Sequence, residues 1–166
     1  MCGRYLIEER EIFPSGRAPV IVGRDEVQKE ELTWGIPMRS GLLINARGET
    51  VTEKPTFRSA FQRGRCLVPA TEFYEWSDRV KYAFFQKKGL LYLAGIERET
   101  KRGRRFVILT REAEGLVSNY HHRMPVIVPE ERALTYLREL DYALFLASGG
   151  QRTDGLNVER RSGNDF

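Results

Sequence analysis

The stretch RCLVPATEFYEW, residues Arg65–Trp76, carries the strand pattern from which the rest of the chain can be interpreted. Its first half, Arg65–Ala70, is mostly apolar and predicts a β-strand that runs into an aromatic segment. Within that segment, Glu75 lies between Tyr74 and Trp76. Such a carboxylate either points to solvent from an alternating strand or lies in a partly desolvated site with a raised pKa. The residues alone favour the exposed position.

Segments on either side of this stretch predict short elements. Residues 56–63 have apolar side chains at helical spacing and predict a short helix. Three further strands are expected at Tyr82–Gln86, Leu90–Ile96 and Phe106–Thr110, with a hairpin turn at Lys88–Gly89 between the first two. Their short connections favour antiparallel pairing.

The clearest helical pattern begins at Pro129, with an apolar stripe that ends at Leu140. A second short helix is expected from Asp141 to Ala147. Residues 162–166 are expected to form a frayed tail. Together these elements predict one α+β domain over residues 1–166, which is long enough to bury a core.

Composition narrows the class of protein. The 166 residues include 27 Lys and Arg against 23 Asp and Glu, a mildly basic balance that permits a polyanionic partner without requiring one. The absence of a long apolar run and of a secretory signal predicts a soluble cytoplasmic protein without membrane contact. The two cysteines, Cys2 and Cys66, are expected to be separate reduced thiols.

The start of the chain, Met1-Cys2, offers unusual chemistry if the initiator methionine is removed. The new terminus would carry an α-amine and a thiol on one residue, with ordinary pKa values near 8 and about 8.5. Such a 1,2-aminothiol condenses with an aldehyde to an imine, and the thiol then closes a thiazolidine ring. The alternative is that a small second residue is present by chance.

Four separated segments together resemble one protein family. They are MCGRY at 1–5, INARGET at 44–50, RCLVPATEFYEW at 65–76 and HHRMPVIV at 121–128. In this order they are similar to the blocks of the SOS response associated peptidase (SRAP) family. The resemblance implies mostly antiparallel strands in a barrel-like core with a few short helices. It also implies a role in DNA repair, with binding to single-stranded DNA and covalent capture of abasic sites, whose opened sugar carries an aldehyde.

Carried over by position, the resemblance assigns catalytic roles to Cys2, Asn45, Glu75 and His121, and DNA contacts to Arg4 and Arg47. The chain also departs from the family pattern. His122 stands where an acidic residue is common, only Arg17-Ala18-Pro19 matches an Asn-x-Ala-Pro stretch, and residues 34–45 are short and lack a stacking aromatic after Trp34.

The residue types suit the implied chemistry. A carboxyl with a raised pKa can donate the proton that expels water from a carbinolamine and take a proton back later, and Glu75, flanked by rings, is the candidate. His121 has a suitable pKa to open the closed sugar, and Asn45 can hold the amine or a sugar hydroxyl. Without the family resemblance, Asn45 is equally well a strand-end cap, and His121 an ordinary surface or core histidine.

Two other functions remain open at this point. One is a thiol peptidase whose substrate is its own Met1-Cys2 bond or another peptide, since Cys and His can perform acyl transfer. The other is a noncatalytic module for single-stranded DNA. Lyase activity by β-elimination would accompany the imine. We expect a monomer without cofactor or metal, because two distant cysteines and two adjacent histidines lack zinc-ligand spacing. When bound to DNA it would be nucleoid-associated.

Overall fold

A five-strand barrel forms the centre of the computed structural model, which describes residues 2–162. Its strands follow the order β12-β4-β3-β8-β11, and β11 pairs with β12 to close the ring. Four of the five contacts are antiparallel, whereas β12 and β4 are parallel. The strands are β3 (Arg17–Val22), β4 (Gln28–Trp34), β8 (Arg65–Ala70), β11 (Leu91–Thr100) and β12 (Gly103–Glu112).

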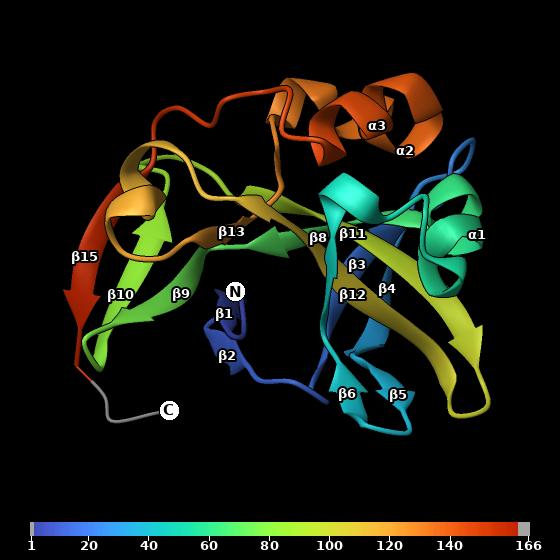
Figure 1. The fold of residues 1–166 in the computed structure, drawn as a ribbon, viewed down its shortest axis with the longest axis horizontal. Helices are drawn as coiled ribbons and strands as arrows, with labels where there is room; N and C mark the ends of the chain where they lie inside the picture. Colours follow the sequence, from blue (N-terminus) through green and yellow to red (C-terminus); the bar gives the residue numbers. More distant parts are fainter. Residues whose placement is uncertain (1, 163–166) are drawn as a thin grey trace.

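A second sheet lies beside the barrel, at the left of Figure 1. Its order is β15 (Asn157–Arg161), β10 (Val80–Phe85), β9 (Glu72–Ser77), β1 (Tyr5–Ile7) and β2 (Arg10–Ile12). The chain passes from the barrel to this sheet at Thr71, whose backbone N–H donates to Leu6 O at 2.7 Å. The stretch from Arg65 to Trp76 therefore supplies one strand to each sheet.

Shorter elements complete the fold. The strands β5 (Ile36–Met38) and β6 (Gly41–Leu43) form a hairpin, β7 (Asn45–Arg47) lies parallel to β12, and β13 (Arg123–Pro125) and β14 (Ile127–Val128) extend the barrel sheet. Helices α1 (Pro55–Arg63), α2 (Ala133–Arg138) and α3 (Leu140–Ala147) lie outside the barrel, at the upper right of Figure 1. Three 3₁₀ turns occur at η1 (Gly48–Thr50), η2 (Gly115–Asn119) and η3 (Glu130–Arg132).

The expected α+β class, with mostly antiparallel strands in a barrel-like core and a few short helices, is confirmed. Two local expectations are wrong. The segments around Lys88–Gly89 do not form a hairpin, because β10 pairs with β9 and β15 whereas β11 belongs to the barrel. The helix expected from Pro129 is divided, because Glu139 adopts an extended conformation between α2 and α3.

Some expectations concern single residues or the chain ends. Cys2 and Cys66 are both free and buried, as expected of separate thiols. In residues 2–162 no helix has both the length and the apolar character needed to cross a membrane. Removal of Met1 lies outside the described residues, and so does the tail expected at 162–166 except for its first residue.

Arg65 fastens two helices to the barrel although it is only 4% exposed. Its Nε donates to Tyr136 O at 2.7 Å and its Nη1 to Phe61 O at 2.7 Å. Weaker bonds reach Gln62 O and Leu137 O, both at 3.2 Å. Burial lowers the pKa of this guanidinium. Its partners are carbonyls at the ends of α1 and α2, where the helix dipoles favour a cation.

We predict that Arg65→Met lowers the free energy of unfolding by about 3 kcal/mol, because several buried carbonyls lose a charged donor. Urea denaturation measures this loss. Arg63→Met, at an exposed position of the same helix, removes the same charge and should change stability by less than about 0.5 kcal/mol. Equal effects of the two substitutions would contradict the anchoring role.

Candidate functional site

The start of the chain is held as an interior strand of the second sheet. β1 lies between β2 and β9, with Tyr5 opposite Phe73. The Tyr74 backbone N–H donates to Arg4 O at 3.0 Å, which continues the pairing toward the terminus. In an antiparallel pair this register sets Gly3 opposite Glu75. The first described residues therefore run alongside the carboxylate that the sequence singles out.

The two faces of β9 have different environments. Phe73 and Glu75 share the inner face with Tyr82, which is the register partner of Glu75. Glu75 is only 2% exposed, so the exposed position favoured by the residues alone is wrong. Tyr74 and Trp76 project from the opposite face. The rings that border Glu75 in sequence are therefore not the ones beside it in space.

Burial controls the protonation of both candidate reactive groups. Burial raises the pKa of Glu75 from 4.5 to about 7, so its carboxyl can give or take a proton near neutral pH. Cys2 has no exposed surface, and burial raises the pKa of its thiol far above the ordinary value. The negative charge of Glu75 raises it further. The thiol is therefore neutral, and it lies within the electrostatic reach of Glu75.

Asn45 reaches the same place from β7. Its Nδ2 donates to Cys2 O at 3.1 Å and to Ile108 O at 3.3 Å, the latter on the neighbouring strand β12. Its Oδ1 is buried and accepts no hydrogen bond from any group in residues 2–162. Asn45 therefore holds the backbone of Cys2 and offers an unused acceptor beside it.

His121 follows η2 at the inner face of the second sheet. The ring of Tyr120 packs on Tyr82 at 4.6 Å and on Phe84 at 5.5 Å between centroids. Tyr82 is the partner of Glu75, so this packing brings the His121 backbone toward the same sheet face. Val117 accepts the His121 backbone N–H at 3.0 Å and fixes the turn.

The protonation of His121 follows from its own contacts. Its Nδ1 lies 3.0 Å from the Arg123 backbone N, whose N–H can donate to it, and 3.2 Å from Arg123 O, to which it donates in the other tautomer. Burial lowers the pKa of His121 below its usual value. The exposed ring of His122 stacks on His121 with 4.5 Å between centroids. The His121 ring is thus neutral at neutral pH.

The arginines expected to contact DNA differ in their surroundings. Arg47 is exposed, two residues beyond Asn45. The guanidinium carbon of Arg4 lies 4.2 Å from the centroid of the Phe13 ring and 4.9 Å from that of Trp76. Cation–π contacts with two rings hold its plane in place.

Sequence reasoning missed Phe13, which is 45% exposed at the rim of this region. The Phe13–Gly16 turn is closed by Gly16 N–H to Phe13 O at 2.8 Å, with Ser15 at φ +75°. Pro14 suits the second position of such a turn. The turn is tied to the barrel by Ser15 N–H to Trp34 O at 2.9 Å. The exposed ring is therefore presented from an anchored loop.

A second missed feature is the ion pair of Glu49 with Arg123. Two guanidinium nitrogens of Arg123 donate to the Glu49 carboxylate at 2.7 and 2.8 Å, and one also donates to Thr110 Oγ1 at 3.0 Å. Hydrogen bonding to Arg123 lowers the pKa of Glu49 to about 2. This pair joins the segment of Asn45 to the segment of His121. Glu49 lies in INARGET and Arg123 in HHRMPVIV, and neither segment by itself predicts that the two side chains pair.

We predict that Glu75→Gln changes the pH dependence of stability. The folded pKa of about 7 lies above the ordinary 4.5, so the Glu75 contribution is fully present below about pH 4.5 and is lost as pH rises through 7. Relative to wild type, the variant should gain up to about 3 kcal/mol between about pH 4.5 and pH 8.

Chemical denaturation at several pH values measures this difference. Glu26→Gln, at an exposed turn, is the matched control and should follow the wild-type profile. Parallel wild-type and Glu75→Gln profiles would contradict a raised pKa in the folded state.

The named proteins to which this chain is similar are each described as an abasic site processing protein. An abasic site processing protein of Bacillus subtilis, YoqW, is 34% identical over 109 residues, covering 57% of this chain and 47% of the relative. HMCES of Gallus gallus is 27% identical and covers 78% of this chain and 53% of the relative. YedK of Escherichia coli is 27% identical, with 82% and 65% covered. The chain thus spans about half the length of the first of these relatives.

Solved structures agree on the fold. A protein from Bacteroides thetaiotaomicron matches with a TM-score of 0.74 and 26% identity, over 96% of this chain and 84% of that chain. A phage-related protein from Bordetella bronchiseptica matches with a TM-score of 0.80 at 22% identity, over 98% and 95%. The sequence model of the family described as SOS response associated peptidase (SRAP) matches residues 4–147. Because this match spans most of the chain, the protein belongs to the SRAP family.

Proposed function

We propose that this protein binds single-stranded DNA at abasic sites and forms a covalent thiazolidine crosslink through Cys2 after removal of Met1. The observation that carries the proposal is the convergence on Cys2, where Asn45 Nδ2 holds its carbonyl and the Glu75 charge acts on its thiol. The relatives named abasic site processing proteins support the same substrate.

In the proposed reaction, the carboxyl of Glu75 carries the proton in both transfers. The α-amine of Cys2 adds to the aldehyde carbon of the opened sugar and gives a carbinolamine. Protonated Glu75 donates a proton to the departing hydroxyl, so water leaves and an iminium forms. The thiol then adds to the iminium carbon while its proton passes to the Glu75 carboxylate. The ring closes, and Glu75 is again protonated. A pKa of about 7 suits both transfers.

Asn45 and His121 would prepare the substrate. The unused Asn45 Oδ1 accepts a hydrogen bond from the amine or from a sugar hydroxyl. In the tautomer whose Nδ1 accepts the Arg123 N–H, neutral His121 carries its proton on Nε2 and would donate it to the ring oxygen of the closed sugar, which assists opening. If the imine persists before ring closure, β-elimination cleaves the strand, which would appear as a secondary lyase activity.

A thiol peptidase for other proteins is less well supported. Thiol peptidases need a thiolate, whereas burial and Glu75 raise the pKa of Cys2. Proton transfer to Glu75 suits ring closure on an iminium carbon better than attack on a distant peptide. Cleavage of the protein's own Met1-Cys2 bond would serve as the step that releases the α-amine.

We predict that the wild-type protein forms a heat-resistant adduct with an abasic oligonucleotide and that Cys2→Ala forms none, because the ring needs its thiol. Denaturing gels reveal the adduct, and mass spectrometry of the intact protein shows whether Met1 has been removed. Cys66→Ala is the matched control, since Cys66 is also buried and free, and it should retain the crosslink.

In the same assay, Glu75→Gln should slow crosslinking by about 100-fold or more, the usual range for loss of a proton shuttle. A crosslink that survives Cys2→Ala would refute the proposal. If the wild type and Cys2→Ala bind single-stranded DNA equally well and neither forms the crosslink, the protein is a noncatalytic binding module.

We predict that Arg47→Ala weakens binding to undamaged single-stranded DNA and lowers the slope of log affinity against log salt by about 0.7, the value for one phosphate contact on a single strand. Fluorescence anisotropy across a salt series measures it. Arg63→Ala, an exposed arginine on α1, should leave the slope unchanged. An unchanged slope for Arg47→Ala would contradict a phosphate contact.

A further inference from the structure

A basic notch lies between the β5–β6 hairpin and the β11–β12 turn, at the lower edge of the barrel in Figure 1. We define it by the cavity of about 300 Å³ whose lining combines two apolar residues with three cations and a threonine: Ile36, Pro37, Arg98, Thr100, Lys101 and Arg102. No carboxylate is among them. The notch therefore has an apolar wall and a rim that is positive throughout.

Strand pairing indicates that the positive charge of the notch does not stabilise the fold. Arg98 and Arg105 are direct cross-strand partners on β11 and β12. Like charges at such positions are destabilising. Strand alternation places Glu97 on the opposite face, where it accepts Arg104 Nε at 2.9 Å. The nearby acid is thus engaged on the other side of the sheet.

Arg98 in the notch and its cross-strand partner Arg105 have guanidinium donors beyond those that backbone carbonyls accept. Arg98 donates to Thr56 O and Arg105 to Gly35 O, each at 3.1 Å. The Nε of Arg105 is buried and has no acceptor within residues 2–162, so it is not a donor that a phosphate in the notch can reach. Across the same residues no ion pair engages Arg98, Lys101, Arg102 or Arg105. Elsewhere on the surface, cations such as Lys29 and Arg161 are paired with glutamates.

The notch is close to the site around Cys2. Pro37, in its wall, pairs with Leu42 of β6, and Asn45 follows three residues later along the chain. At about 3.3 Å per residue, the chain from Leu42 to Asn45 spans about 10 Å. Exposed Arg47 follows on the same strand. A strand of nucleic acid with its abasic sugar at Asn45 can therefore reach the notch within a few nucleotides.

We propose that the basic notch binds backbone phosphates of the same single-stranded DNA, next to the abasic nucleotide. This inference rests on the proposed function for the location of the damaged sugar and extends it to a second contact. Arg98 supplies a fixed guanidinium donor in the lining of the notch, and its cross-strand partner Arg105 adds positive charge beside it. Lys101 and Arg102 at the turn meet the phosphates from outside.

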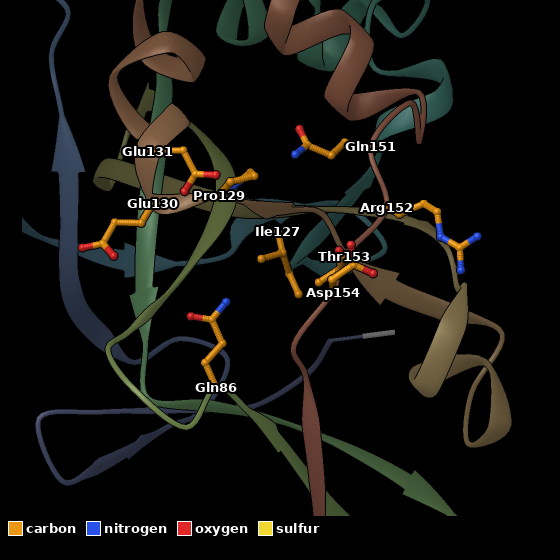
Figure 2. Close-up of a pocket in the computed structure, with 9 residues that line it drawn as sticks. All are labelled: Gln86, Ile127, Pro129, Glu130, Glu131, Gln151, Arg152, Thr153 and Asp154. Atoms are coloured by element: carbon orange, nitrogen blue, oxygen red, sulfur yellow. The ribbon is translucent and has the colours of Figure 1, made fainter.

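Another cavity of similar size shows the contrast. Figure 2 shows the pocket bordered by Glu130, Glu131 and Asp154, with a volume of about 290 Å³. Its one arginine, Arg152, has a carboxylate oxygen of Glu114 at 3.9 Å. A phosphate there would meet three carboxylates, so that pocket does not suit a DNA backbone. The two cavities differ in charge rather than in size.

The chain supplies a matched control at the other end of β11. Lys87 and Lys88 form an exposed turn just before that strand, and Lys101 and Arg102 form one just after it. The ten residues of β11 separate the two turns by about 30 Å. Replacing either pair with alanine removes two positive charges from an exposed turn, but only the second pair lies at the notch.

The test compares Lys101→Ala/Arg102→Ala with Lys87→Ala/Lys88→Ala on undamaged oligodeoxythymidylates of about 16 and about 4 nucleotides. On the longer strand the notch variant should lower the slope of log affinity against log salt by about 1.4, which corresponds to two phosphates at 0.7 each. The short strand should show a smaller change, because it has fewer phosphates to occupy the notch and the site around Cys2 together. The control variant should match wild type with both strands.

An equal change in slope for both variants, or no change for the notch variant, would overturn the inference. Crosslinking separates it from the proposed function. The notch variant should still form the adduct with a short abasic oligonucleotide at the wild-type rate. If the wild type forms no adduct but the slope changes as expected, the notch stands and the crosslinking proposal fails. A wild type that binds neither oligonucleotide overturns the notch as well.

Discussion

The candidate site depends on the pairing of β1 with β9. This pairing makes the start of the chain an interior strand rather than a loose end, through contacts such as Tyr74 N–H to Arg4 O. It fixes which face of β9 each residue occupies, and so it buries Glu75 beside Cys2. Without this register the same residues would form an ordinary amphipathic strand with its carboxylate in water.

This arrangement places polar groups in the interior of the fold. A carboxyl on the apolar inner face and an amide with an unused acceptor both oppose folding unless the surrounding structure compensates. The closed barrel and buried anchors such as Arg65 provide that compensation. The ion pair of Glu49 with Arg123 adds a link between the segments that carry Asn45 and His121. A strongly bonded scaffold therefore surrounds polar groups whose burial opposes folding.

Much of the fold follows from local sequence patterns, whereas the site follows from strand pairing. The apolar run at Arg65–Ala70 and the helix at residues 56–63 are both present, because burial pattern and period determine them. The β1–β2 hairpin has no sequence signal, since its turn residues Glu8 and Glu9 both have positive φ where Asn-Gly is usual. The inward direction of Glu75 depends on its register with Tyr82, which no local pattern specifies.

The full burial of Cys2 has a consequence for the lifetime of its sulfur in a cell. Peroxide and alkylating metabolites react with exposed thiolates, and their reaction falls steeply for a neutral thiol that solvent cannot reach. Under the proposed function, this burial would spare the sulfur the slow accumulation of sulfenic and sulfinic acids between encounters with damaged DNA. Burial of the Cys2 sulfur therefore protects it from oxidation as well as fixing its position.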